Sequence, residues 1–120
     1  MTLFQKIIDK EIPADIIYED DISLVFKDIN PQAPIHLLII PKKPIVKVSD
    51  ASKEDKDLLG HLMWVAGEVA RQLGVEDSFR LVVNNGAKAG QSVFHVHIHL
   101  LSGRPFPGHQ VNLLTYVKNR

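Results

Sequence analysis

The stretch Val-Phe-His-Val-His-Ile-His-Leu-Leu, residues 93–101, decides how this 120-residue sequence is interpreted. His95, His97 and His99 alternate in it with aliphatic residues. Successive side chains of a β-strand point to opposite faces, so the alternation predicts a strand with three imidazoles on one face. Imidazole groups are costly to bury without hydrogen-bond partners, so we expect this face to form a functional site rather than part of the core.

Two kinds of chemistry suit a row of three histidines. A metal site is one, because neutral imidazole is a common zinc ligand. The outer Cα atoms of the row are ~13 Å apart at ~3.3 Å per residue, whereas Zn–N bonds of ~2.1 Å require donor atoms within ~3.5 Å of one another. One ion bound by all three is therefore disfavoured. Phosphoryl or nucleotidyl transfer is the other, in which the central nitrogen attacks phosphorus and its neighbours hold oxygens or transfer a proton.

The loop before this stretch favours the transfer chemistry. Glycines allow the backbone to approach an anion, and amide and hydroxyl groups can donate to phosphate oxygens. An ordinary hairpin turn is the alternative, because Asn-Gly is a common turn dipeptide. However, about seven residues separate Asn85 from Val93, more than the roughly 2–5 of most hairpin loops. We therefore interpret the segment as a phosphate-binding loop, and its polar and small residues are Asn84, Asn85, Gly86, Gly90, Gln91 and Ser92.

Composition excludes several other classes of function. Fourteen Lys and Arg residues balance fourteen Asp and Glu residues, so a broad basic face for nucleic acid is not expected. The sequence has no cysteine, which excludes disulfides, a thiol nucleophile and sulfur ligands for a metal. No apolar run approaches the roughly 20 residues of a membrane span, and the first residues lack the apolar core of a signal peptide. We therefore expect a cytoplasmic protein that binds neither nucleic acid nor membrane.

The chain is predicted to form one domain over residues 1–120, with 106–120 as a C-terminal tail. Helical spacing of apolar residues predicts helices over 3–10 and 52–73, and β-rich runs predict strands over 16–19, 23–27, 36–40, 80–85 and 93–101. Pro13 should end the first helix, while Ser52 should cap the second and Gly74 should stop it. The run 36–40 is almost wholly apolar, so both faces of its sheet should be covered. Short strands joined mostly by tight turns indicate an antiparallel α+β domain.

One side of the long predicted helix carries small residues. Gly60, Trp64 and Gly67 are spaced by four and three residues. Glycine inside a helix costs about 1 kcal/mol relative to alanine, so two glycines on one side suggest close approach by another element. That element is either the protein's own sheet or a partner helix across a two-fold axis, and the spacing alone leaves both open.

A wider resemblance extends these inferences. The segment His-Val-His-Ile-His-Leu-Leu is similar to the signature of the histidine-triad family, in which three histidines alternate with apolar residues. Four longer segments resemble its Hint branch, the purine-nucleoside phosphoramidases: FQKIIDKEIPADIIYED (4–20), FKDINPQAPIHLLIIPKK (26–43), LLGHLMWVAG (58–67) and RLVVNNGAKAGQSVFHVHIHLLSGRP (80–105). The resemblance therefore covers nearly the whole chain.

The resemblance implies a fold and an activity. Members of this branch are homodimers of an α+β unit with a five-stranded antiparallel sheet and two helices, paired partly through the long helix. They hydrolyse adenosine and guanosine 5′-monophosphoramidates, and aminoacyl-adenylates, to the nucleoside monophosphate without a metal or other cofactor. Two alternatives stay open: a dinucleoside-polyphosphate hydrolase or nucleotidyltransferase of the same family, and a non-catalytic nucleotide-binding or zinc-binding regulator.

The resemblance also assigns roles to individual residues. His97 matches the nucleophile, which forms a covalent nucleotidyl-histidine intermediate, and His36 matches a fourth histidine that supports the site. Asp28 matches the carboxylate that accepts the ribose hydroxyls. Either Ser92 or His99 is expected to protonate the leaving amine, and the sequence does not decide between them. The other matching positions are His95 beside the nucleophile, Ile29, Asn84, Gly90 and Gln91 near the ribose and phosphate, and Phe4, Ile7, Phe26 and Leu38 around the purine.

Two features depart from the pattern of the branch. Asn30 stands where serine is usual, near the expected ribose position. The tail runs on to Arg120 with Phe106 and Tyr116 as its aromatic residues, whereas some relatives place a tail tryptophan near the partner's active site. The only tryptophan of this chain is Trp64, in the long predicted helix. The tail is therefore expected to tune the choice of leaving group.

Overall fold

The computed structural model describes residues 1–106. Within them lie the helices α1 (Leu3–Ile8) and α2 (Lys56–Gln72) and the strands β1 (Ile16–Glu19), β2 (Ser23–Lys27), β3 (Ile35–Pro41), β4 (Arg80–Val82) and β5 (Ile98–Ser102). Single turns of 3-10 helix occur at Val48–Asp50, Lys53–Asp55 and Ala87–Ala89. Except for Phe106, the predicted tail at 106–120 lies outside the described residues.

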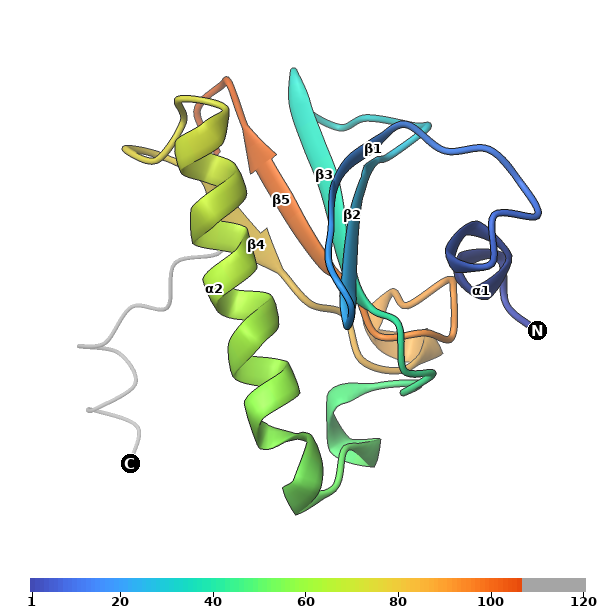
Figure 1. Cartoon of the computed structure of the whole chain (residues 1–120). Helices are drawn as coiled ribbons and strands as arrows, with labels where there is room; N and C mark the ends of the chain where they lie inside the picture. Colours follow the sequence, from blue (N-terminus) through green and yellow to red (C-terminus); the bar gives the residue numbers. More distant parts are fainter. Residues whose placement is uncertain (107–120) are drawn as a thin grey trace, which may run out of the picture.

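The strands form one sheet in the order β1-β2-β3-β5-β4, and all neighbours in it are antiparallel. The first three strands follow one another as a meander, and β5 lies between β3 and β4 (Figure 1). β3 pairs with β5 from Ile35 opposite Ser102 to Ile39 opposite Ile98. The predicted α+β fold, a five-stranded antiparallel sheet with two helices, is therefore confirmed.

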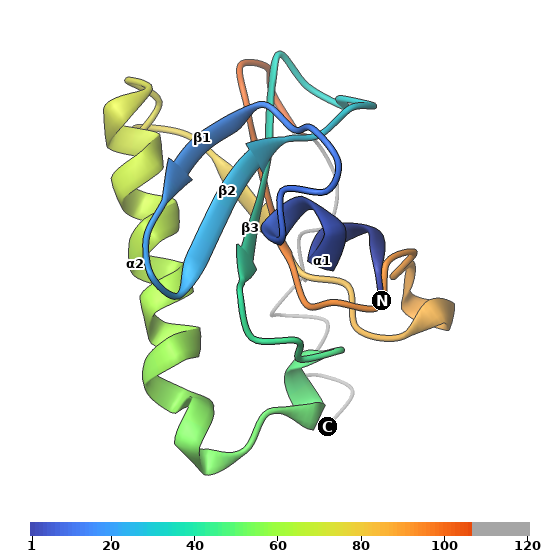
Figure 2. The same cartoon turned by 45° about the vertical axis from the view of Figure 1, so that its right-hand side comes forward.

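The two helices cover opposite faces of the sheet. In Figure 2, α2 lies on one side of β1, β2 and β3, and α1 lies on the other. Successive side chains of β2 and β3 point to opposite faces of the sheet, and each face packs against one helix. Val25 and Leu37 pack in the core with α2, whereas Leu24 and Leu38 pack in a second core with Phe4 of α1. Apolar residues on both faces of these strands are thus buried, as the run at 36–40 predicted.

Both helices have boundaries that differ slightly from the prediction. α1 ends at Ile8, well before Pro13, and the chain turns away at Lys10 with a positive φ of 62°. The predicted start at Ser52 is a 3-10 turn in which Asp55 Oδ2 accepts the Ser52 N–H at 2.8 Å, and α2 begins directly after it. Gly74 follows the last turn with φ 71°, a conformation that glycine adopts without strain. Within residues 1–106, no helix is both long and apolar enough to cross a membrane.

Two predicted strands are shorter than expected. β4 ends at Val82 rather than at residue 85, and β5 begins at Ile98 rather than at residue 93. Residues 93–97 run irregularly beside the loop that follows β3, where the Val96 N–H donates to the Ile45 carbonyl at 2.7 Å. The prediction of one strand carrying all three histidines is therefore wrong for the two that precede Ile98, because that segment bonds to a loop instead of a neighbouring strand.

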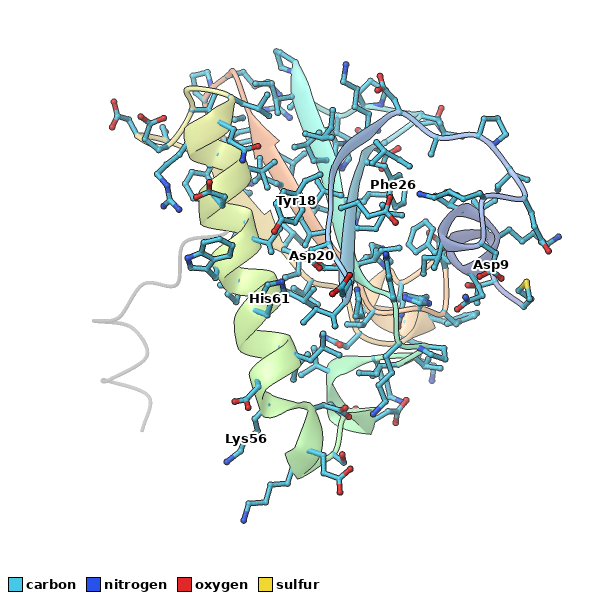
Figure 3. All side chains as sticks on the ribbon, viewed as in Figure 1. Asp9, Tyr18, Asp20, Phe26, Lys56 and His61 are labelled. Carbon is cyan, nitrogen blue, oxygen red and sulfur yellow. The ribbon has the colours of Figure 1, made fainter. Side chains whose placement is uncertain are left out.

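The turn between β1 and β2 is joined to α2 through the carboxylate of Asp20. Its Oδ1 accepts the backbone N–H of Ser23 at 2.7 Å, and its Oδ2 accepts from the Tyr18 hydroxyl at 2.9 Å and from His61 Nε2 at 2.7 Å. Figure 3 shows Tyr18, Asp20 and His61 together where α2 passes the sheet. His61 also stacks on Trp64, with ring centroids 6.0 Å apart. This network fixes the position of α2 along the sheet.

The small-residue side of α2 faces away from the sheet. The Trp64 and Met63 side chains are 55% and 54% exposed. In the described part of the chain, no other element has an atom within 4 Å of the point where a Cβ on Gly60 would lie. At Gly67 the nearest atom belongs to the side chain of Arg71, at 3.6 Å. Contact with the protein's own sheet, one of the two alternatives for these glycines, is therefore wrong.

Candidate active site

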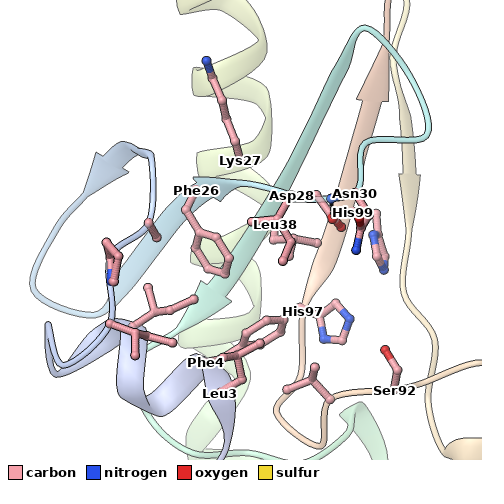
Figure 4. Close-up of a pocket in the computed structure, with 16 residues that line it drawn as sticks. Leu3, Phe4, Phe26, Lys27, Asp28, Asn30, Leu38, Ser92, His97 and His99 are labelled. Carbon is pink, nitrogen blue, oxygen red and sulfur yellow. Dashed lines mark hydrogen bonds between the residues drawn. The ribbon is translucent and has the colours of Figure 1, made fainter.

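A pocket of about 290 Å³ opens between α1, the end of β2 and the start of β5 (Figure 4). This volume is close to the lower end of the ~300–1,000 Å³ that small-molecule sites occupy. Apolar side chains line one part of it, and the polar residues that line the rest are Lys27, Asp28, Asn30, Ser92, His97 and His99. The predicted site residues in its wall are Phe4, Ile7, Phe26, Asp28, Ile29, Leu38, Ser92, His97 and His99.

The apolar part of the pocket is built from aromatic rings packed edge to face. Phe4 and Phe26 have ring centroids 5.4 Å apart at 73°, and Phe4 lies 5.0 Å from the His97 ring at 89°. Phe4 comes from α1 and Phe26 from β2, so the pocket depends on the packing of this helix against the sheet. A flat apolar ligand group bound between these side chains would lie beside His97.

The hydrogen bond of His97 defines which of its nitrogens is free. Nδ1 lies 2.8 Å from the carbonyl oxygen of His95, and a carbonyl can only accept, so Nδ1 carries the proton. In the neutral ring Nε2 then has an unshared electron pair. Among the contacts within residues 1–106, Nε2 has no hydrogen-bond partner, and the ring is only 4% exposed. The geometry therefore leaves Nε2 of His97 without a partner among the described residues, at the wall of the pocket.

His99 and His36 form a second, connected pair. The backbone N–H of Gln32 donates to His36 Nδ1 at 3.0 Å, so the proton of a neutral His36 is on Nε2. His36 Nε2 then donates to His99 Nδ1 at 2.9 Å. His99 in turn carries its own proton on Nε2, the nitrogen that does not face His36. Two successive hydrogen bonds therefore make His99 a hydrogen-bond donor within the pocket.

The surroundings keep these rings neutral. Burial, with the neighbouring His97 and His36, lowers the pKa of His99 to about 4, against the opposing effect of Asp28. Burial also lowers the pKa of His36, again opposed by Asp28. The same cause lowers the pKa of His95, although its bond to a backbone carbonyl acts in the other direction. The proton positions assigned to His36 and His99 are those of the neutral rings that these lowered pKa values favour at pH 7.

Asp28 follows β2 directly and has two separate contacts. Its Oδ1 accepts the backbone N–H of Asn30 at 2.8 Å, a bond that closes a local turn. Its Oδ2 lies 3.4 Å from His36 Nε2, and the side chain is 19% exposed. Asp28 is thus both a turn residue and a carboxylate in the pocket wall.

The structure does not bring every predicted residue into the pocket. His36 lies behind His99, and His95 is buried with its Nε2–H donating to the Pro41 carbonyl at 2.7 Å. His95 acts on the pocket through its backbone, because its carbonyl oxygen accepts the Nδ1–H of His97. In this structure the His95 ring is therefore not part of the pocket wall, and His95 contacts His97 through its backbone.

The loop from Asn84 to Ser92 is also organised differently from the prediction. The side chain of Gln91 is 3% exposed and points into the loop, where its Nε2 donates to the carbonyls of Val46 and Val93 at 2.6 and 3.1 Å. Its Oε1 accepts the Gly86 N–H at 2.7 Å. Asn84 lies beside Gly90, whose φ is 96°, and neither residue lines the pocket. Of the loop residues 84–92, Ser92 lines the pocket, and Val93 directly after it does so as well.

Three groups in the site lie close enough together to be considered as metal ligands. One atom each of Asp28, His36 and His99 lies within 4.8 Å of the others, and zinc accepts this combination of donors. However, His36 Nε2 and His99 Nδ1 share a proton at 2.9 Å, and Nδ1 of His36 already accepts a backbone N–H. An ion here would have to displace that proton, so the geometry favours a hydrogen-bonded role for these residues.

Sequence reasoning missed several residues of the pocket wall and one contact behind it. The backbone N–H of Gln32, which sets the proton of His36, follows from tertiary structure and has no signal in the sequence. Leu3 had a signal, because it lies four residues before Ile7 and so on the same side of α1. The missed residues of the wall are Leu3, Ile12, Pro13, Ala14, Lys27 and Val93.

Comparisons with known proteins give one consistent family. Residues 9–106 match the HIT domain. The chain is 63% identical over 105 residues to an uncharacterised HIT-like protein of Synechocystis, a match that covers 88% of this chain and 92% of that protein. It is 50% identical over 105 residues to the purine nucleoside phosphoramidase of Escherichia coli, with 87% of this chain and 88% of that enzyme covered.

Solved structures agree with the sequence comparisons. A HIT family hydrolase from Legionella pneumophila superposes with a TM-score of 0.86 at 44% identity, covering 89% of this chain and 96% of that one. A HIT family hydrolase from Clostridium thermocellum gives a TM-score of 0.87 at 42% identity, with coverage of 92% and 96%. The fold is therefore shared, over about nine-tenths of this chain, with proteins described as hydrolases.

Proposed function

The chain belongs to the HIT domain family, and from that premise we propose that it hydrolyses purine nucleoside 5′-monophosphoramidates to AMP or GMP and an amine. The relative in Escherichia coli named for this activity supports the substrate class. The observation that carries the proposal is the geometry of His97. Its Nδ1–H donates to the His95 carbonyl, so the electron pair on Nε2 is free beside the apolar part of the small pocket.

The reaction proceeds in two steps at His97. In the first, Nε2 attacks the α-phosphorus, the P–N bond breaks, and the amine leaves with the bonding electron pair and one proton. A covalent nucleotidyl-histidine results, and the His95 carbonyl stabilises the positive ring through Nδ1–H. In the second step water attacks the same phosphorus and gives one proton to Nε2 of His99, which releases the nucleoside monophosphate and restores both rings to their neutral state.

We assign His99 as the proton donor to the leaving amine: its Nε2–H bonds to the leaving nitrogen and transfers the proton as the P–N bond breaks, while Ser92 donates to the phosphate. The hydrogen bonds from Gln32 to His36 and from His36 to His99 support this assignment, because they leave His99 with a proton on Nε2. The His97 and His99 rings have centroids 5.0 Å apart, so one phosphate group can lie against both. Ser92 lines the same pocket and offers a hydroxyl.

The nucleoside is held by the opposite part of the pocket. We assign Asp28 to the ribose hydroxyls, since its Oδ2 is a carboxylate oxygen in the wall and a hydroxyl group can donate to it. The purine lies among Phe4, Ile7, Phe26 and Leu38, with the exposed side chain of Ile29 at the rim. Asn84, Gly90 and Gln91 act indirectly, by shaping the loop that carries Ser92.

A substrate panel in the presence of a chelator tests the proposal. We expect hydrolysis of adenosine 5′-monophosphoramidate that does not depend on added metal and exceeds hydrolysis of diadenosine polyphosphates. Faster turnover of the polyphosphates would favour the dinucleoside-polyphosphate hydrolase instead. Loss of all turnover, together with stoichiometric zinc in the purified protein, would favour the non-catalytic regulator.

His97→Ala tests the covalent step. Deletion of a nucleophile should lower kcat by a factor of at least ~10⁴. Rapid acid-free quenching of the wild type with labelled substrate, followed by peptide mapping, should place the nucleotide on His97. His61→Gln, which removes a histidine outside the pocket, should retain both activity and label. A His97→Ala enzyme with more than a few per cent of activity would contradict the mechanism.

We also propose that two copies of the chain pair through the exposed side of α2, and that the enzyme works in the cytoplasm, where nucleotides are available. The exposed Trp64 and Met63, with open space at Gly60, provide an apolar surface on which a second helix can approach closely. Trp64→Glu should convert a dimer to a monomer in analytical ultracentrifugation. A wild-type protein that sediments as a monomer at all concentrations would contradict the pairing.

A further inference from the structure

The turn that follows β5 contacts the loop between β2 and β3 at two points. Arg104 donates to the carbonyl of Gln32 through Nε at 3.2 Å and through Nη2 at 3.0 Å. Next to it, Gly103 has φ 99°, and a Cβ at this position would lie 2.8 Å from Cβ of Pro34. A glycine is required at such a close approach. The turn therefore supports this loop by direct packing and by two hydrogen bonds from one side chain.

Gln32, the residue that Arg104 supports, also orients His36. The carbonyl of Gln32 accepts from Arg104, and the backbone N–H of Gln32 donates to His36 Nδ1 at 3.0 Å. Pro31 and Pro34 flank this segment, and a proline has no N–H to donate. The chain of contacts is continuous, from Arg104 through Gln32 and His36 to His99 in the pocket wall.

We propose that Arg104 is a positioning residue for the pair His36 and His99. It holds the Gln32 backbone in place. As a result, the proton of His36 stays on Nε2 and the proton of His99 stays on its pocket-facing nitrogen. This inference rests on the proposed function only for its effect on turnover. Without Arg104 the Gln32 carbonyl loses both of its hydrogen bonds to the guanidinium, the bond from Gln32 to His36 loosens, and each ring populates the alternative tautomer. In that tautomer His99 has no proton to give to the leaving amine.

An alternative role for Arg104 is to anchor Phe106 alone. Its guanidinium carbon lies 4.4 Å from the centre of the Phe106 ring. Arg80 contacts the same residue, with its guanidinium carbon 4.9 Å from the ring and Nη2 donating to the Phe106 carbonyl at 2.8 Å. No hydrogen bond joins Arg80 to Gln32 among residues 1–106, so Arg80→Gln is a matched control. It removes a guanidinium from Phe106 and leaves the histidine pair untouched.

Steady-state kinetics with adenosine 5′-monophosphoramidate form the first test. Arg104→Gln should lower kcat about three- to tenfold, the effect of weakening one or two hydrogen bonds, with KM changed less than twofold. Arg104→Lys should recover part of the loss, because it keeps the charge but not the paired donors. Arg80→Gln should match the wild type. Equal losses for Arg80→Gln and Arg104→Gln would assign the effect to Phe106 and overturn the proposal.

A double-mutant cycle shows whether the effect passes through His36. In a His36→Ala background, Arg104→Gln should change kcat less than twofold, because the residue through which it acts is already absent. A full three- to tenfold loss in that background would mean that Arg104 acts by another route, and the proposal would be wrong.

The histidine tautomers give a readout that needs no substrate. Long-range ¹H–¹⁵N spectra of the free protein at pH 7 should show His36 and His99 protonated on Nε2 in the wild type and in Arg80→Gln. In Arg104→Gln, or in Arg104→Lys if the glutamine variant does not fold, the nitrogen shifts should move toward a mixture of tautomers. Unchanged shifts would overturn the positioning role. An inactive wild type with these spectra would instead contradict the proposed substrate and leave the tautomer result standing.

Discussion

Folding holds His99 as a neutral ring, so the free energy of unfolding should fall as the pH is lowered from about 6.5 to about 4. The pKa of His99 is about 4 in the folded protein and 6.5 in an unperturbed histidine. Between these values the unfolded chain binds a proton that the folded chain does not. Stability rises with pH wherever the unfolded state binds more protons, so here it decreases on acidification. Above pH 6.5 and below pH 4 this group adds no further slope.

The size of the effect follows from the two pKa values of His99. A pKa difference of one unit corresponds to about 1.4 kcal/mol, so the complete loss between pH 6.5 and pH 4 is about 3 kcal/mol. At pH 5, where one proton has been taken up almost fully by the unfolded chain and hardly at all by the folded one, the loss is about 2 kcal/mol. The lowered pKa values of His36 and His95 act in the same direction and steepen the dependence.

Urea denaturation of the wild type and of His99→Asn between pH 7.5 and pH 5 measures this contribution. The range ends at pH 5 because most carboxylates begin to protonate below it. The protein concentration is kept fixed, since the stability of an oligomer depends on it. At pH 7.5 the difference between the two proteins gives the cost of the substitution itself. We expect that difference to shrink by about 2 kcal/mol at pH 5. Parallel profiles for the two proteins would refute the reasoning.

Two further substitutions examine the pocket and the loop. Asp28→Asn should lower kcat/KM about ten- to a hundredfold for ribonucleoside phosphoramidates and much less for 2′-deoxy analogues, because hydrogen bonds to a charged acceptor are worth about 1.5–3 kcal/mol. Equal losses on both substrates would make Asp28 a purely structural turn residue. Gln91→Ala should lower the free energy of unfolding by about 2–3 kcal/mol, because it leaves the Gly86 N–H and the Val46 carbonyl without their partner. A loss below about 0.5 kcal/mol in urea denaturation would show that the loop does not depend on the Gln91 hydrogen bonds.

The sequence was sufficient to predict the sheet and its two covered faces because the relevant signals are local. Residues 37–40 of β3 are all apolar, and a strand whose two faces are both apolar has to be buried on both sides. The long helix was equally predictable, since its buried residues recur with helical period and Gly74 ends it. In each case the residues that carry the signal are also the residues that make the contacts.

The details of the loop were not predictable, because they depend on contacts between distant segments. Gln91 has the chemistry of a phosphate ligand, and nothing near it in the sequence indicates that its amide bonds to Val46, which is 45 residues away. Similarly, residues 93–97 have the alternation of a strand, but the Val96 N–H finds Ile45 rather than a strand partner. A local pattern describes which conformation is favourable, whereas pairing decides which one is adopted.

The irregular segment before β5 also provides the hydrogen-bond acceptor of His97. A residue in the interior of a sheet uses its carbonyl in the ladder of hydrogen bonds to a neighbouring strand. Because β5 begins only at Ile98, the carbonyl of His95 lies outside the ladder and accepts the Nδ1–H of His97 at 2.8 Å. A regular strand through residues 93–101 would have kept the three imidazoles on one face but would have engaged this carbonyl elsewhere. The departure from the predicted strand therefore supplies the acceptor for the Nδ1–H of His97, on which the proposed attack by Nε2 depends.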